Sequence, residues 1–406
     1  MRVRALLAAA VLLATTACTQ EQPDAPEQVT LTWWDHFDHS PMADQAVTGL
    51  LARYQQEHPE VRVERRALSR DDFRTSLAEA TASGAFPDIA AVDAADLPRL
   101  ADRGVLADLT DRFAGWPLTD RFLGPVRESA THDGRFRGVP LRSTTTALVY
   151  DREVFERAGQ AGPPTTWEGL RATARALTTG ERAGLCFPAS GEEATATFLP
   201  LLWQAGGDLA DLATGGADAL AYLDDLVNTD RSAPADVLGW TGADVAARFA
   251  EGRCAMALAD TGAIPTLNQA GLDWSAAPLP GGEAGAATVL GGETWVVGGS
   301  SRHVDQAWAL LTWLAETRDN ATEFGGGLGA LPNRSDTVDD LAWQWDPNLG
   351  GFTGQLGTAR SRTAYGAKYA EISAVIGGAV ADVLGGRREP GEAAGSAGDE
   401  VGRLLG

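Results

Sequence analysis

The sequence predicts an α/β fold with at least two domains. In the first hundred residues, runs of strand character alternate with runs of helical period, in the order strand, helix, strand, helix, strand. A second alternating series begins with a short strand at residues 184–187. A chain of 406 residues that is 44% hydrophobic can form more than one sizeable core. We therefore expect mostly parallel sheets with helices on their faces.

The first strand, residues 29–34, leads directly into candidate site residues. Its side chains alternate between apolar and polar, as in a half-buried strand. Trp34, Asp35 and His36 come where this strand ends, and loops at the carboxyl ends of strands bind ligands in α/β folds. Trp33 is one residue out of phase with Trp34, so it is expected to face the core.

Four further elements complete this unit: a helix at 43–54, a strand at 61–65, a helix from about 70 to 83 and a strand at 86–92. Ser69 and Asp72 have the spacing of a capping box that opens the second helix. The last strand ends in Asp93, which is a further candidate at a carboxyl end.

The middle of the chain joins this unit to a second one. Residues 134–151 read as an extended segment that precedes a short helix, and Thr165 and Glu168 suggest a capping box after two prolines. The predicted elements beyond are strands at 184–187 and 253–259, with helices at 198–205, 219–227, 245–249, 304–315, 364–384 and 392–405.

Residues 290–300 combine two glycines with a polar strand start. Gly291 and Gly292 permit close approach of backbone, and Glu293, Thr294 and Trp295 then open an apolar strand. An acid, a hydroxyl and an aromatic ring suit a small polar ligand with apolar faces. A tight turn into a buried strand with a core tryptophan explains the same residues, and the sequence leaves both interpretations open.

The N-terminus indicates export. Residues 1–17 have the short basic start and apolar run of a signal peptide, and the small residues before Cys18 are typical of a lipobox. Thr15 departs from the usual aliphatic residue, so ordinary secretory cleavage stays open. Residues 18–28 are expected to form a flexible tether that links a lipid on Cys18 to the fold.

The amino-acid composition limits which classes of molecule the chain is expected to bind. With 33 basic and 55 acidic residues, the chain has a formal net charge of −22, which argues against nucleic acid. Cys186 and Cys254 lie in short apolar runs, and in an exported protein they are either a disulfide or two buried thiols.

Several stretches in order resemble one family along nearly the whole chain. They include LTWWDHF, SGAFPDIAAVD, GRFRGVPLRSTTTALVYDREVFERAG, PPTTWEGL, LLWQAGGDL, FAEGRCAMAL, LGGETWVVGGSS, AWALLTWLAE and GALPNRSDT. The chain resembles the extracellular solute-binding proteins of ABC importers, specifically the family 1 carbohydrate-binding lipoproteins that include maltose-binding protein.

The resemblance implies a two-lobe periplasmic-binding-protein-like fold of the type II style, in which crossover strands act as hinges. Residues 29–143 and 294–337 would form the N-terminal lobe, and residues 144–293 and 338–406 the C-terminal lobe. It implies a monomeric, lipid-anchored protein at the extracellular face of the cell membrane. This protein would bind a small carbohydrate between the lobes and deliver it to ABC permease subunits, without catalysis and without a cofactor.

The resemblance also implies which further residues contact the ligand. Sugars need carboxylates for their hydroxyls and rings for their C–H faces. Gly292, Glu293 and Trp295 would lie at the second crossover, and further tryptophans are implied near the cleft, namely Trp203, Trp240, Trp343 and Trp345. Members often carry an aromatic after the strand that holds Met256, but here ALADTGAIPT follows, so a maltose-type subsite plan does not transfer directly.

Two other classes of function deserve comparison. Residues 35–39 contain metal-ligand types, but His58, His132 and His303 stand alone in the sequence, so we expect no metal site. Asp35, Asp93 and Glu293 are the residue types that a glycoside hydrolase needs, yet the chain has no G-x-S-x-G or H-E-x-x-H motif. A binding protein for a non-sugar solute remains the other alternative.

Overall fold

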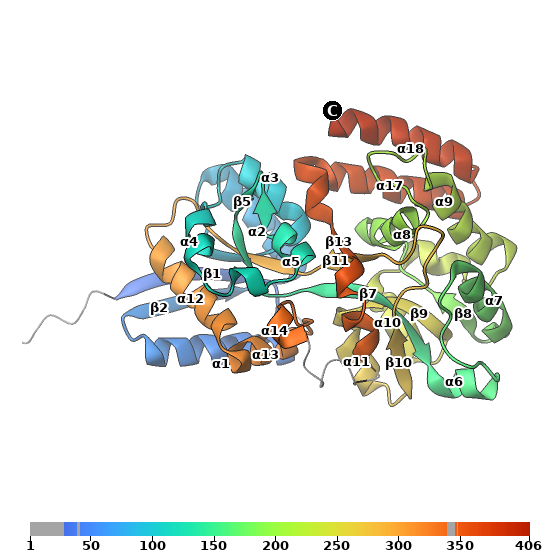
Figure 1. Cartoon of the computed structure of the whole chain (residues 1–406), viewed down its shortest axis with the longest axis horizontal. Coiled ribbons are helices and arrows are strands. Elements are labelled where there is room, and N and C mark those ends of the chain that lie inside the picture. Colours follow the sequence, from blue (N-terminus) through green and yellow to red (C-terminus); the bar gives the residue numbers. More distant parts are fainter. Residues whose placement is uncertain (1–27, 39–40, 339–345, 347) are drawn as a thin grey trace, which may run out of the picture.

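The computed structural model describes residues 28–38, 41–338, 346 and 348–406. Two sheets lie side by side, each flanked by helices, and strand β7 extends from one body toward the other (Figure 1). We call the body around the first sheet the N-terminal lobe and the other the C-terminal lobe. The α/β class predicted from the sequence is therefore confirmed.

The N-terminal lobe is built on a sheet of strand order β2-β1-β3-β12-β6. Its strands are β1 (Val29–Asp35), β2 (Val61–Ala67), β3 (Ile89–Asp93), β6 (Gly138–Pro140) and β12 (Glu293–Val297), and a separate hairpin holds β4 (Thr131–His132) and β5 (Arg135–Phe136). Its helices are α1 (Pro41–Glu57), α2 (Arg70–Ser83), α3 (Leu97–Asp102), α4 (Thr110–Gly115), α5 (Gly124–Ser129), α12 (Val304–Glu316), α13 (Arg318–Gly327) and α14 (Ser335–Val338).

The C-terminal lobe has the strand order β13-β11-β7-β9-β8, with β10 paired to β7. Its strands are β7 (Thr144–Asp151), β8 (Ala183–Cys186), β9 (Cys254–Asp260), β10 (Trp274–Ala277), β11 (Thr288–Gly291) and β13 (Ala359–Ser361). Its helices are α6 (Arg152–Arg157), α7 (Trp167–Leu177), α8 (Glu192–Gln204), α9 (Gly216–Asp224), α10 (Gly242–Ala250), α11 (Ile264–Gln269), α16 (Gly350–Thr353), α17 (Tyr369–Leu384) and α18 (Pro390–Leu405).

Each sheet is parallel except where the chain has just crossed from the other lobe. In the first sheet, β12 runs against its neighbours β3 and β6. In the second, β7 runs against β9, β10 and β11. A strand that arrives from the facing lobe enters its new sheet from the opposite end, which explains its reversed direction.

The chain crosses between the sheets twice in the described residues. The first crossing joins β6 to β7, and the second passes from β11 to β12 through Gly292 alone. Gly292 has a φ of 112°, and a Cβ built there would lie 2.2 Å from the carbonyl oxygen of Arg142. Only glycine fits this position. Glu293 already pairs with Asp93 in the first sheet, one residue before the predicted lobe boundary.

Several local expectations can be compared with the structure. Ser69 caps α2 by accepting a hydrogen bond from the Asp72 amide, as predicted. The predicted cap at Thr165 is wrong, because Thr166 accepts the hydrogen bond from the Gly169 amide and the Thr165 carbonyl instead accepts one from Gly281. The helix predicted at residues 198–205 begins earlier, at Glu192, because its first turn is polar and breaks the apolar period.

Cys186 and Cys254 form a disulfide that joins the adjacent strands β8 and β9. Both side chains are buried. None of the helices in the described ranges combines the length and apolar character that a membrane-spanning segment needs.

Candidate functional site

The carboxyl edges of the two sheets face each other. Strand β3 ends at Asp93, and its partner β12 begins beside it at Glu293. In the second sheet, β9 ends at Asp260 and β11 at Gly291. Because only Gly292 separates β11 from β12, the two edges meet at one place, which we call the seam. In α/β folds the carboxyl edge is where ligands bind, so the seam is the candidate site.

Glu293 is the centre of a buried ionic network in the seam. Its side chain is only 4% exposed, and its Oε2 accepts a hydrogen bond from Nη1 of Arg142 at 2.7 Å. Its Oε1 lies 3.4 Å from Nε2 of His36. The guanidinium of Arg142 also donates to the carbonyl of Leu328 at 2.9 Å. Glu293 therefore ties the loop after β1 to the first crossing.

Charge explains why Glu293 stays ionised although it is buried. Burial alone would raise the pKa of Glu293, but the guanidinium of Arg142 and the ring of His36 hold that pKa well below its usual range. Burial likewise opposes the charge on Arg142, yet the carboxylates of Glu293, Asp260 and Asp93 raise its pKa. The seam thus holds acidic groups from both sheets around one buried arginine.

Asp93 forms a second ionic contact in the seam. Its two carboxylate oxygens accept hydrogen bonds from Nη2 of Arg362 at 2.9 and 3.2 Å, and Oδ1 also accepts from the amide of Ala95 at 2.8 Å. Arg362 follows β13 in the second sheet, and its guanidinium lies over the ring of Tyr369 at 5.6 Å. Burial opposes the charge on Arg362, but Asp93 and Tyr369 raise its pKa. This pair links the two sheets directly.

A third ionic contact lies further out and is solvated. Nη2 of Arg74 in α2 is 2.8 Å from Oε2 of Glu192 in α8, and about half of each side chain is exposed. The neighbouring Glu193 accepts a hydrogen bond from the amide of Gly242. Burial raises the pKa of Glu193, which the backbone amide of Gly242 partly offsets. Helices of opposite lobes are therefore in contact here.

Two partly exposed tryptophans lie near the contact of Arg74 with Glu192, and each carries an arginine. Trp34 packs against the cluster that contains Phe73, and Trp240 stands two residues before Gly242, which bonds to Glu193. Trp34 precedes the carboxyl end of β1, with the guanidinium of Arg66 at 4.8 Å from its ring centroid. Trp240 lies next to the segment that follows β8, with Arg248 at 4.1 Å from its ring. Such rings can stack on the apolar faces of a ligand once the guanidinium moves aside.

Other predicted site residues lie in the cores of the lobes. Asp35 is fully buried and accepts hydrogen bonds from Nε of Arg65 and Nε1 of Trp33, both at 2.7 Å. Trp295 is also fully buried, against the rings of Trp33, Phe37 and Phe324. In this structure neither residue faces the seam, which gives both a packing role.

Trp203 is likewise in a core, 2% exposed, where its Nε1 donates to the hydroxyl of Tyr365 at 3.0 Å. His36 is 4% exposed and reaches the seam through Glu293. Trp343, Trp345 and Cys18 lie outside the described residues.

Sequence reasoning missed the arginines that organise the seam. Arg142, Arg362 and Arg74 each pair with an acid that is more than a hundred residues away in the sequence. Arg142 stands within the extended segment recognised from the sequence, but nothing in its neighbours marks it as a partner for Glu293. Only the tertiary fold brings these pairs together.

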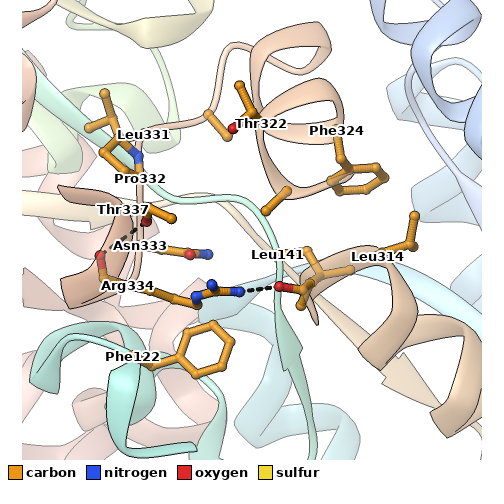
Figure 2. Close-up of a pocket in the computed structure, with 14 residues that line it drawn as sticks. Phe122, Leu141, Leu314, Thr322, Phe324, Leu331, Pro332, Asn333, Arg334 and Thr337 are labelled. Atoms are coloured by element: carbon orange, nitrogen blue, oxygen red, sulfur yellow. Dashed lines mark hydrogen bonds between the residues drawn. The ribbon is translucent and has the colours of Figure 1, made fainter. Parts of the chain in front are cut away.

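A pocket in the N-terminal lobe lies beside the first crossing (Figure 2). It is lined by Leu141, Phe122, Phe324 and Leu331 together with Arg334. The Arg334 guanidinium is already bonded to the carbonyl of Ala315 and the carboxylate of Asp336. The pocket therefore offers apolar walls, with its buried charge already paired.

Both the sequence and the fold of this chain are similar to those of known proteins. Residues 49–351 match the sequence model of the bacterial extracellular solute-binding proteins. An uncharacterised lipoprotein of Streptomyces antibioticus is 30% identical over 382 residues, which cover 90% of this chain and 83% of that protein.

Solved structures of similar fold include two with named ligands. An ABC transporter solute-binding protein from Thermotoga lettingae, bound to α-D-tagatose, has a TM-score of 0.82 at 25% identity and covers 93% of this chain and 100% of its own. The cyclic α-maltosyl-1,6-maltose binding protein of Arthrobacter globiformis has a TM-score of 0.79 at 28% identity, with 93% and 99% covered. Both match this chain along nearly its whole length.

Proposed function

Because this chain belongs to the bacterial extracellular solute-binding proteins, which bind solutes for ABC transporters and are not enzymes, we propose that its solute is a sugar or short oligosaccharide. The observation that carries the proposal is the seam itself. It gathers carboxylates from the carboxyl edges of both sheets, and Trp34 and Trp240 lie near the outer contact between the lobes. The two solved neighbours described above bind carbohydrates, which agrees with this choice.

The chemistry of the seam supports sugar as the ligand. Asp93 and Arg362 offer an acceptor and donors side by side, which suits adjacent hydroxyl groups. Trp34 and Trp240 offer ring faces for the apolar C–H faces of a pyranose. The ligand enters when the lobes part at the two crossings and is enclosed when they close again, because a few extended residues can absorb the hinge motion.

The proposal includes where the protein works. An acyl chain on Cys18 would hold it at the outer face of the cell membrane, and the tether of residues 18–28 would let the lobes reach ABC permease subunits. The similarity to a lipoprotein over most of both chains is consistent with this anchoring.

A ligand panel tests the proposal. Intrinsic fluorescence and thermal unfolding of the untagged protein would be measured with α-D-tagatose, maltose, maltotriose and cyclic oligosaccharides, and with amino acids, polyamines and metal salts as controls. A ligand at about a hundredfold excess over its Kd stabilises the native state by about 2.7 kcal/mol. A shift from a non-sugar alone would refute the sugar assignment.

Matched tryptophan variants locate the bound sugar. Trp34→Ala should abolish or strongly weaken binding, since loss of a stacking ring removes most of the apolar contact. Trp313→Ala is the control, because Trp313 also carries an arginine, Arg53 at 5.4 Å, but bonds to Glu57 on α1 within the N-terminal lobe. Equal effects of the two substitutions on affinity would place the sugar away from Trp34.

A further inference from the structure

One histidine outside the seam meets two carboxylates. His132 is the last residue of β4, and the two-residue turn Asp133-Gly134 leads from it into β5. Its Nε2 lies 2.7 Å from Oδ1 of Asp102, the last residue of α3, and 3.5 Å from Oδ2 of Asp133. His132 stands alone in the sequence because Asp102 lies 30 residues away, and the fold brings the two side chains together.

One proton cannot satisfy this arrangement. In the tautomer that carries its hydrogen on Nε2, a neutral imidazole donates its single N–H to Asp102, whose oxygen is 2.7 Å away. The carboxylate of Asp133 then faces the same nitrogen and a second carboxylate without a proton of its own. Arg135, on the same hairpin, does not supply the missing charge to this group, since its Nη1 is bonded to Asp108 at 2.8 Å.

A divalent ion can take the place of the imidazole proton between these three side chains. One ligand atom from each of the three residues lies within 4.8 Å of the others. Zinc binds histidine nitrogen and carboxylate oxygen at about 2.0–2.2 Å in tetrahedral geometry, which places ligand atoms about 3.3 Å apart. The two measured distances, 2.7 and 3.5 Å, bracket that spacing. Small side-chain rotations therefore suffice to admit the ion.

We propose that Asp102, His132 and Asp133 bind a divalent transition metal of the Zn²⁺ type. A nitrogen with two carboxylate oxygens favours such an ion over Mg²⁺ or Ca²⁺, which prefer all-oxygen sites. Asp102 and Asp133 are 52% and 82% exposed, so water completes the coordination shell. The ion ties the β4–β5 hairpin to the end of α3. This site is separate from the sugar proposal and does not depend on it.

Isothermal titration with ZnCl₂ tests the site, using untagged full-length protein stripped with EDTA. We expect one equivalent of Zn²⁺ to bind the wild type and to raise its melting temperature. His132→Gln should weaken binding by more than about 100-fold, because even outer-shell partners of a metal site typically contribute about 10- to 100-fold. His58→Gln is the matched control, since His58 lies 3.4 Å from one carboxylate, Glu60, and belongs to no three-residue group of metal-ligand side chains in the described part of the chain.

Asp133→Asn is a second variant in case His132→Gln fails to fold, because Asp133 is exposed and asparagine tolerates its positive φ of 50°. Loss of the Zn²⁺ equivalent in both variants, with retention in His58→Gln, supports the site. Absence of binding to the wild type, or binding that survives both substitutions, overturns it. An equal loss in His58→Gln would mean only adventitious surface binding and would overturn it as well.

Discussion

The inner and outer parts of the seam use the same chemistry in opposite surroundings. Inside, Glu293 and Arg142 are 4% and 12% exposed, and their pair joins the second crossing to the first. At the outer edge, Glu192 and Arg74 join α8 to α2 with 57% and 50% exposure. Both contacts are arginine–carboxylate pairs of nearly equal length, 2.7 and 2.8 Å. Only their access to water differs.

That difference decides what each pair does. A buried charge that loses its partner keeps its full desolvation penalty, whereas water replaces the lost partner of an exposed charge. We infer that the inner pair fixes the geometry of the crossings and that the outer pair modulates how readily the lobes meet. Asp93 and Arg362, 33% and 14% exposed, lie between these extremes.

The largest effect should come from Glu293→Ala. It removes the carboxylate that accepts a hydrogen bond from the largely buried guanidinium of Arg142, so we expect the free energy of unfolding to fall by about 3–5 kcal/mol. Urea unfolding without ligand measures this. Glu323→Ala is the control, because Glu323 pairs with Arg53 at the surface and should cost no more than about 1 kcal/mol. From the sequence alone, Glu293 fitted a ligand residue as well as the start of a buried strand after a tight turn.

The pH dependence of the stability difference between wild type and Glu293→Ala gives an independent check on the ion pair of Glu293. The pKa of Glu293 is held below its usual value in the folded state, so its contribution is present above the unfolded pKa of about 4.3 and is lost as pH falls toward the folded pKa. The stability gap between wild type and Glu293→Ala should therefore narrow between roughly pH 5 and pH 2. A gap that stays constant over this range would contradict an ionised, paired Glu293.

Asp93→Asn should have an intermediate effect. The carboxylate is one-third exposed and water can partly replace it, so we expect a loss of about 1 kcal/mol in urea unfolding. A double-mutant cycle with Arg362→Gln should show coupling between the two sites, since each removes the same contact. Independent, additive losses would mean that the pair does not join the lobes in solution.

The sequence was most informative where the physics is local. The alternation of Trp33 and Trp34 predicted which of the two faces the core, and Ser69 with Asp72 marked the start of α2. Strand ends were also readable, and this located Asp93 at the seam. These features depend on neighbours within four residues, so the chain order records them directly.

What the sequence could not show depends on distant partners. Asp35 and Trp295 have the residue types of a sugar site. In the fold, however, the carboxylate of Asp35 accepts a hydrogen bond from Arg65, and the ring of Trp295 packs in a cluster of aromatic rings. Neither partner can be recognised before the strands are aligned. Arg142 and Arg362 were missed for the same reason: their partners are distant in the sequence. An isolated arginine in an extended segment also has no periodic pattern that would mark it.

The smallest effect should come from Glu192→Gln, which tests the outer end of the comparison. An exposed pair contributes about 0.2–1 kcal/mol, so urea unfolding should change little. Glu153→Gln removes an equally exposed pair, with Arg157, inside one lobe and should change stability to the same small extent.

Of these two substitutions, only Glu192→Gln alters contact between the lobes, and we expect it to lower the affinity for a bound sugar about two- to fivefold. That loss should vanish in 1 M NaCl, where the screening length is about 3 Å, because salt removes the same attraction from the wild type. A salt-independent loss would instead make Glu192 a direct ligand contact.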